Sequence, residues 1–250
     1  MTPRLVAVVL NWNGGDDTLA ALASLEGIET ICVDNGSTDG SDGQVERSFP
    51  QVELLRLGAN LGFAGGNNAG IRRALERGAD WVLLLNNDAE AEPGLAAALL
   101  EAARARPDAG LLACKIVDAG GRNVQYAGAS FNARLGYSGR VATDGADELR
   151  DVGRADGAAF AVSRAAAERA GLLDEMLFLY VEDVEWSLRV RAAGFSVVFV
   201  PDASVRHRGS TASGGAASTT NLYYDTRNTI AVAERYAPLP PGLRALRRGV

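Results

Sequence analysis

The sequence has little of what marks exported, membrane-spanning or nucleic-acid-binding proteins. It contains only two cysteines and one histidine, and its formal net charge is −6. It shows no basic and apolar leader and no apolar run long enough to cross a bilayer, so we expect a cytoplasmic protein. Its Lys and Arg residues are scattered rather than clustered, which argues against nucleic acid as a partner.

Three further features have ordinary interpretations. Cys32 and Cys114 each lie inside an apolar run, where a small buried thiol is the expected role. Residues 243–248 are basic and partly apolar, which would suit peripheral contact with an anionic membrane, but a solvated helix end is the favoured interpretation. Residues 209–218 are small and uncharged, as in a mobile loop or lid.

The first half of the chain alternates short β-rich runs with amphipathic segments. We expect strands at residues 5–10, 30–33, 52–57 and 81–85, and helices at residues 17–25, 41–49, 65–77 and 93–105. This alternation predicts an α/β fold with a Rossmann-like, mostly parallel central sheet flanked by helices, because each crossover returns over the sheet to begin another parallel strand. The length of 250 residues suits a single domain.

The second half is less regular, which predicts a mixed arrangement of strands and helices. We expect strands at residues 110–117, 124–131, 158–162 and 196–200, and helices at residues 164–170 and 182–193. Gly194 directly follows the second of these helices and is a typical helix stop.

Polar clusters follow three of the expected parallel strands, at residues 11–14, 34–37 and 86–88. Ligands of open α/β sheets bind at the carboxyl ends of the strands, so we expect these clusters to meet in one crevice. Asp88 is a candidate ligand for a hard divalent cation, which prefers oxygen donors and keeps positions open for phosphates. The alternative is that Asp88 forms an Asx turn that caps the helix expected after Pro93.

Two later segments also carry candidate chemistry. His207 is flanked by Arg206 and Arg208, a combination suited to a diphosphate, although a lone histidine is more often a surface or core residue. The expected helix at residue 182 begins with Glu182 and Asp183, whose adjacent charges would raise each other's pKa and make a general base, or would simply favour the helix N-terminus.

Trp186 and the glycine-rich stretch at residues 58–70 are less specific signals. Trp186 offers a flat surface for a sugar ring, or it is a core residue. The glycines would let backbone amides approach a ligand, but their spacing matches neither a P-loop nor a dinucleotide fingerprint.

Six segments in this order resemble glycosyltransferase family 2, of inverting mechanism and GT-A fold, and most closely its rhamnosyltransferase-like members. They are Val8-Val9-Leu10-Asn11-Trp12-Asn13-Gly14, Val33-Asp34-Asn35-Gly36-Ser37-Thr38-Asp39-Gly40, Asn60-Leu61-Gly62-Phe63-Ala64-Gly65-Gly66-Asn67-Asn68, Leu85-Asn86-Asn87-Asp88, Glu182-Asp183-Val184-Glu185-Trp186, and His207. The resemblance covers most of the chain, because the segments extend from the first expected strand to the single histidine.

The resemblance implies a role for each matching position. The donor sugar nucleotide would be held by Asn11, Asn13, Asp34, Ser37, Asn60, Gly65, Asn68, Asn87 and Asp88. Mg²⁺ or Mn²⁺ would be bound by Asp88 and His207, and Asp183, rather than Glu182, would be the catalytic base. Trp186 would contact the acceptor. Residues 1–117 would form the nucleotide-sugar half, and residues 118–235 the acceptor-binding and catalytic half, of a single GT-A domain.

The implied reaction transfers a sugar, with rhamnose the leading candidate, from dTDP-rhamnose or a UDP-sugar to a glycan or lipid-linked acceptor of the cell envelope. Such an enzyme would act at the inner face of the membrane. Asn86 and Asn87 depart from the Asp-x-Asp metal motif of relatives, which keeps open an inactive nucleotide-sugar-binding module that donor hydrolysis would expose. A sugar-nucleotide pyrophosphorylase is a further alternative, but the segment after the first strand is acidic instead of basic.

Overall fold

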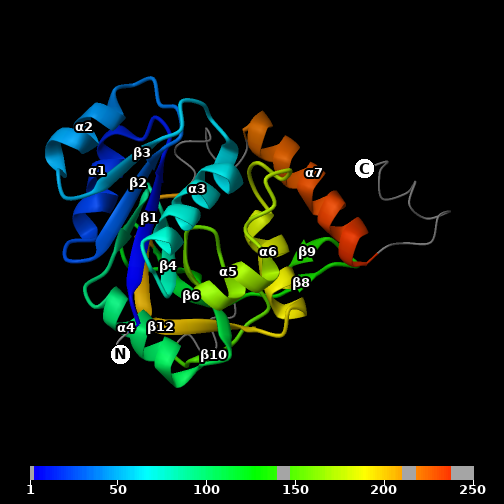
Figure 1. Cartoon of the computed structure of the whole chain (residues 1–250). Coiled ribbons are helices and arrows are strands. Elements are labelled where there is room, and N and C mark those ends of the chain that lie inside the picture. Colours follow the sequence, from blue (N-terminus) through cyan, green and yellow to red (C-terminus); the bar gives the residue numbers. More distant parts are fainter. Residues whose placement is uncertain (1–2, 140–146, 210–217, 238–250) are drawn as a thin grey trace.

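The computed structural model describes residues 3–139, 147–209 and 218–237 (Figure 1). The strands are β1 (Leu5–Asn11), β2 (Glu29–Asp34), β3 (Glu53–Arg56), β4 (Trp81–Asn86), β5 (Ala89–Ala91), β6 (Ala109–Asp118), β7 (Val124–Tyr126), β8 (Phe131–Asn132), β9 (Tyr137–Ser138), β10 (Arg150–Asp151), β11 (Ala159–Ser163) and β12 (Ser196–His207). The helices are α1 (Gly15–Ser24), α2 (Ser41–Ser48), α3 (Gly62–Glu76), α4 (Leu95–Ala105), α5 (Arg164–Ala170), α6 (Glu182–Ala192) and α7 (Thr219–Tyr236).

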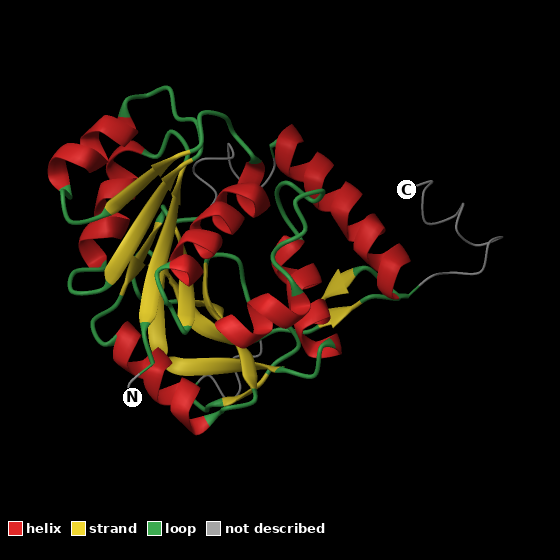
Figure 2. Ribbon diagram, in the orientation of Figure 1, coloured by secondary structure: helices red, strands yellow, loops and turns green. Residues whose placement is uncertain are grey.

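One large sheet organises the molecule, with helices packed against its faces (Figure 2). Its strand order within the described chain is β10-β12-β6-β11-β4-β1-β2-β3, and β5 and β7 pair with β12 and β6. β1 runs parallel to β2 and β4, and β2 runs parallel to β3, as the alternation of the first half predicts. β11 lies antiparallel between β4 and β6, so the second half is mixed, and the predicted fold class is confirmed.

The main hydrophobic core packs against this sheet, and Trp186, which was predicted to contact the acceptor, is part of it. Trp186 is fully buried, lies edge-on to Phe160 at 5.8 Å between ring centroids, and donates its indole N–H to the carbonyl of Gly171 at 2.7 Å. It therefore offers no surface to an acceptor, and its prediction as an acceptor-binding residue is wrong. The core alternative is correct because the indole N–H finds a buried partner.

The glycine residues at the start of α3 allow the helix to pack closely against its neighbours. A Cβ at Gly66 would lie 2.3 Å from a methyl carbon of Leu10, so only glycine lets the helix approach β1 this closely. Gly65 is buried beside Leu61 and does not line the cavity described below, so the structure does not place it as a donor-binding residue.

Some elements differ from the sequence expectation. The single strand predicted at residues 124–131 is wrong, because the chain is broken into β7 and β8 around Gly128, whose φ is 99°. β12 extends to His207, and helix α7 was not predicted. None of the helices in the described ranges has the length and apolarity to cross a membrane. The proposed lid residues 210–217 and the basic tail 243–248 lie outside the described residues.

Helix α7 is joined to α6 by a buried carboxylate. Glu185 is 1% exposed and accepts hydrogen bonds from Arg189 of its own helix, from Arg235 at 3.1 Å and from the Tyr236 hydroxyl at 2.8 Å. Since a buried carboxylate is stable only when paired and hydrogen-bonded, this cluster fixes the C-terminal end of α7 on the body of the protein.

Candidate active site

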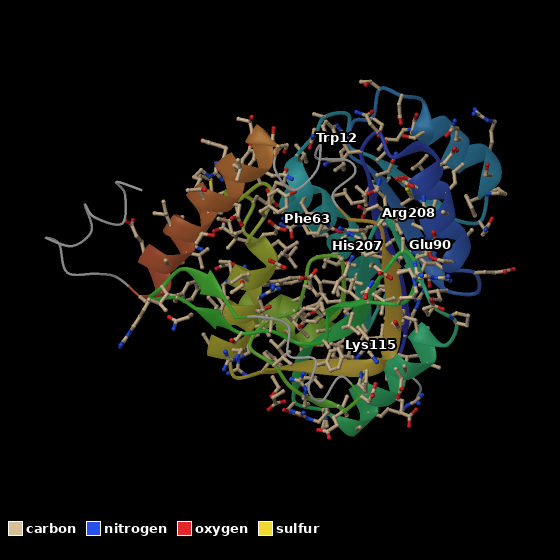
Figure 3. All side chains as sticks on the ribbon, turned by 180° about the vertical axis from the view of Figure 1, so that it is seen from behind. Trp12, Phe63, Glu90, Lys115, His207 and Arg208 are labelled. Carbon is tan, nitrogen blue, oxygen red and sulfur yellow. The ribbon has the colours of Figure 1, made fainter. Side chains whose placement is uncertain are left out.

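A cavity of about 510 Å³ opens where β1 and β4 end, and it is lined by both halves of the chain. Of the predicted site residues it brings together Asn60, Asn87, Asp88, Glu182, Asp183 and His207. Figure 3 labels His207, Trp12 and Phe63, which all line this cavity. The convergence follows from the topology, because parallel strands of one sheet end at the same edge.

The pairing of β5 with β12 brings Asp88 and His207 together. In this antiparallel ladder His207 lies opposite Ala89, the residue that follows Asp88. Nε2 of the imidazole lies 3.2 Å from Oδ1 of the carboxylate, and both side chains are largely buried. The alternative of a helix-capping Asx turn is wrong, because β5 intervenes and α4 begins after Gly94. Burial opposes protonation of His207, but the adjacent carboxylate outweighs it, and the pKa of the imidazole is raised.

The chemistry of this pair fits a divalent cation. Nε2 of His207 is buried, and within the described chain it lies 3.2 Å from Oδ1 of Asp88, so a nitrogen and an oxygen that can both bind a cation lie side by side. No group of three or more His, Cys, Asp or Glu side chains forms a metal cage among the described residues. A cation held here would therefore have two protein ligands and open positions, as cations that bridge substrate phosphates do.

The arginines beside His207 do not face the cavity. Nε of Arg206 lies 2.8 Å from a carboxylate oxygen of Glu92, and Arg208 donates to Asp17 at 2.6 Å and Glu90 at 2.8 Å. Figure 3 shows Arg208 and Glu90 beside each other, to the right of His207. The prediction that these guanidinium groups surround a diphosphate is wrong, because alternate residues of a strand point to opposite faces.

Asn11 organises the loops at the ends of β1 and β2. It is fully buried, and its amide donates to Asp34 at 3.1 Å, Ser37 at 3.1 Å and Ser41 at 2.8 Å. Asn13 accepts from the backbone N–H of Thr38 at 2.7 Å. These predicted donor-binding residues are thus tied to one another, while the neighbouring Trp12 and Asn35 line the cavity.

Asn68 is placed away from the cavity. It is buried, donates to the carbonyl of Leu173 at 2.9 Å and to Glu175 at 2.9 Å, and accepts from the N–H of Leu173 at 3.0 Å. With all these partners it holds the segment before α6 against α3, so the structure gives it a supporting position instead of direct contact with a donor.

The Glu182-Asp183 pair lies at the N-terminus of α6 and lines the same cavity as Asp88. Asp183 accepts from the N–H of Gly157 at 2.8 Å and of Val184 at 2.7 Å, and Nη1 of Arg154 lies 3.7 Å from its Oδ2. Burial raises the pKa of Asp183, and Arg154 opposes that shift. Burial first, and then the charge of Asp183, raise the pKa of Glu182 to about 8.

Arg154 and Asp156 were not singled out from the sequence. They lie beside the Glu182-Asp183 carboxyl groups and come from the segment before β11. Nη1 of Arg154 lies 3.4 Å from Oδ2 of Asp156, and Asp156 and Gly157 line the cavity. They precede β11, which is antiparallel to β4. An antiparallel strand brings its N-terminal end to the edge where parallel strands have their carboxyl ends, so the polar run before residue 158 was the available signal.

The raised pKa of Glu182 predicts a pH-dependent stability. The folded protein holds this proton up to about pH 8, whereas the unfolded chain releases it near 4.5, so the free energy of unfolding falls as the pH rises between these values. Glu182→Gln is expected to flatten that fall, measured by urea unfolding at several pH values. Glu101→Gln, at an exposed position of α4, is the matched control and should keep the wild-type slope. An identical slope in Glu182→Gln would contradict the assignment.

Comparison with known proteins identifies the family. The family model described as "Glycosyl transferase family 2" matches residues 9–171. The chain belongs to glycosyltransferase family 2. This family 2 chain is 30% identical to the N-acetylglucosaminyl-diphospho-decaprenol L-rhamnosyltransferase of Mycobacterium tuberculosis. The alignment spans 267 positions and covers 95% of this chain and 86% of the relative. The chain is 26% identical to the low-salt glycan biosynthesis hexosyltransferase Agl10 of Haloferax volcanii, covering 79% of the chain and 64% of the relative.

Solved structures place the family 2 chain in the GT-A fold. GalNAc-T7 with UDP, GalNAc and Mn²⁺ superimposes with a TM-score of 0.70 at 16% identity, over 99% of this chain and 54% of that one. Mannosyltransferase PcManGT from Pyrobaculum calidifontis, in complex with GDP-Man and Mn²⁺, gives 0.65 at 20% identity, over 99% and 69%. The family match and the rhamnosyltransferase relative show that the chain is a nucleotide-sugar-dependent glycosyltransferase, which removes the pyrophosphorylase alternative.

Proposed function

We propose that this glycosyltransferase transfers rhamnose, with inversion, from dTDP-rhamnose to a hydroxyl of a lipid-linked sugar of the cell envelope. The observation that carries the proposal is that the Asp88-His207 pair and the Glu182-Asp183 pair line the same cavity. One pair suits the leaving diphosphate and the other suits the attacking hydroxyl. A single displacement needs both groups at once, on opposite sides of the anomeric carbon.

Asp183 is the proposed base, and Glu182 keeps its proton. Two adjacent buried carboxyls cannot both be ionised without a large cost, so the charge stays on the one with better partners. Asp183 has Arg154 and two backbone N–H groups, whereas Oε2 of Glu182 has no hydrogen-bond partner in the described chain. Asp183 then takes the proton of the acceptor hydroxyl as the oxygen forms its bond to the anomeric carbon and the nucleoside diphosphate leaves.

Asp88 and His207 are the proposed ligands of Mg²⁺ or Mn²⁺. When bound, the cation would supply positive charge to the diphosphate leaving group. The two GT-A neighbours whose structures contain Mn²⁺ support a metal requirement. Asn87 lines the same cavity, and its side-chain amide donates to the Thr18 hydroxyl of α1 at 3.2 Å. We propose it as a neutral contact for the donor phosphates.

The donor and acceptor are proposed from the relatives and from the walls of the site. The mycobacterial relative is a rhamnosyltransferase of an N-acetylglucosaminyl-diphospho lipid, which favours dTDP-rhamnose and a lipid-linked acceptor at a membrane surface. A second cavity of about 390 Å³ shares Asp183 with the first and is bordered by Ser138, Asp225 and Thr229. Its polar walls suit a hydroxylated acceptor, so residues 118–235 are the proposed acceptor half and residues 1–117 the donor half of one domain.

Product formation tests this proposal directly. The protein is incubated with dTDP-rhamnose, Mn²⁺ and a synthetic N-acetylglucosaminyl-diphosphoryl lipid, and released dTDP and glycosylated lipid are measured. We expect one dTDP per rhamnosylated lipid, with the anomeric configuration of the product opposite to that of the donor. Turnover with UDP-glucose or GDP-mannose but not with dTDP-rhamnose would overturn the donor assignment, and release of dTDP without lipid product would overturn the acceptor.

A further inference from the structure

The segment just before the Glu182-Asp183 pair has an unusual backbone. Phe178, Tyr180 and Val181 have φ values of 64°, 67° and 69°, in the left-handed region that residues with large side chains rarely adopt. Such conformations persist only where the surrounding structure enforces them. Val181 is the N-cap residue of α6, so this backbone sets where the two carboxyl groups of the first turn point.

One side of the segment is held by α3. The carbonyl of Phe178 accepts hydrogen bonds from the N–H groups of Phe63 at 2.6 Å and Ala64 at 3.3 Å, which fill free donors of the first turn of α3. A Cβ at Gly62 would lie 2.5 Å from this same carbonyl oxygen, so the close approach requires glycine there.

The other side is held by one amide of α7. Nδ2 of Asn228 donates to the carbonyls of Leu177 at 2.8 Å, Leu179 at 2.8 Å and Tyr180 at 2.7 Å, and Asn228 is fully buried. Two N–H bonds serve three acceptors, so at least one is shared. Without this amide, the three backbone carbonyls would lose the donor that they share.

Arg227 reinforces the same contact. Its Nη2 donates to the carbonyls of Met176 at 2.7 Å and Leu177 at 3.0 Å, and its Nε donates to Oδ1 of Asn228 at 2.8 Å. The guanidinium lies over the ring of Tyr224 at 5.0 Å, and that ring stacks on Phe178 at 5.2 Å. Asn228 is therefore fixed in the orientation that presents its amide hydrogens to the segment.

We infer that Asn228, supported by Arg227, is a positioning residue for the base Asp183, which makes α7 part of the catalytic apparatus. The apolar contacts alone are few, since the cluster under this segment has only Leu177, Val181, Val184 and Val232 as buried members. The hydrogen bonds of Asn228 and Arg227 are the polar contacts that hold this segment, in which three of the four residues from Phe178 to Val181 are left-handed. The inference rests on the proposed role of Asp183 as base.

The test compares Asn228→Asp with wild type in the dTDP-rhamnose assay. The substitution keeps the size of the side chain but turns a donor into an acceptor that repels the three carbonyls. We expect kcat to fall about 100-fold, because small misplacement of a catalytic group has such effects. The donor KM and the calorimetric Kd for dTDP are expected to stay within about threefold, since the proposed donor contacts Asn87, Asp88 and His207 lie on other elements. Hydrogen exchange in peptides covering residues 174–186 should become faster.

Tyr236→Phe is the matched control, because it removes a bond between α7 and Glu185 at the other end of the helix. It should leave kcat unchanged, and also the exchange of peptides that cover residues 174–182 and exclude Glu185. Wild-type kcat in a folded Asn228→Asp protein, judged by full dTDP-binding stoichiometry, would overturn the inference. If that variant does not fold, Arg227→Ala decides instead, with a smaller loss of kcat expected and no loss overturning it. Activity retained by Asp183→Asn would instead refute the proposed base, which separates the two failures.

Discussion

Asp183→Asn is expected to lower kcat for sugar transfer by about 1,000-fold, the range that a lost general base commonly costs. The amide keeps the shape of the carboxylate, and its single oxygen can still accept from one of the two N–H groups, of Gly157 and Val184, that bind the carboxylate, so the fold and most of the start of α6 should remain intact. Binding of dTDP should be retained, because Asp183 is neither a proposed donor-binding residue nor a proposed metal ligand. Steady-state kinetics together with calorimetric titration of dTDP measure both quantities.

The controls separate the loss of a base from the loss of a charge. Asp202→Asn makes the same chemical change at an exposed position of β12 and should leave kcat at the wild-type value. Glu182→Gln should retain more activity than Asp183→Asn, since Glu182 is already neutral over most of the physiological range. If Glu182→Gln were the less active of the two, the roles of the two carboxyls would have to be exchanged.

Asp88→Asn and His207→Ala are each expected to remove most of the Mn²⁺-dependent gain in dTDP affinity. Each variant takes away one of the two protein ligands that lie 3.2 Å apart, and kcat should fall about 100-fold because charge on the leaving group is no longer offset. Wild-type protein treated with EDTA should behave as the variants do. Calorimetric titration of dTDP with and without Mn²⁺ is the measurement, and the double variant should be little worse than either single one.

Arg206→Ala is the control for this second prediction. Arg206 neighbours His207 in sequence but pairs with Glu92 on the other face of β12, so its loss should leave metal-dependent binding unchanged. Full Mn²⁺ dependence in both Asp88→Asn and His207→Ala would show that the cation is bound elsewhere or that none is used.

The fold of the first half of the chain was predictable because the sequence pattern that specifies it is local. The apolar runs that form β1 and β4 are buried on both faces, and the amphipathic segments between strands have lengths typical of crossover helices. That pattern alone places the ends of β1, β2 and β4 at one edge of the sheet, which is why polar clusters far apart in sequence were expected to meet.

The candidate site was only partly predictable, because contact with a ligand and support of neighbouring residues look alike in a sequence. Asn11 and Asn68 stand in segments shared with the family, yet their hydrogen bonds are all used within the protein. Trp186 lies about one helical turn after the Glu182-Asp183 pair, yet it is buried in the core against Phe160. Burial and hydrogen-bond partners are properties of the packed chain.

The sequence by itself determined the α/β class, the mostly parallel arrangement of the first half and the residue types available for chemistry, because these follow from patterns within short windows, and its motifs carried the resemblance to the family. Only the tertiary structure decided that β5 pairs with β12 to join Asp88 to His207, that the antiparallel β11 brings Asp156 to the site, and that Asn228 of α7 holds the segment before Asp183. These contacts join residues distant in the chain, and no local pattern records a partner that folding alone brings near.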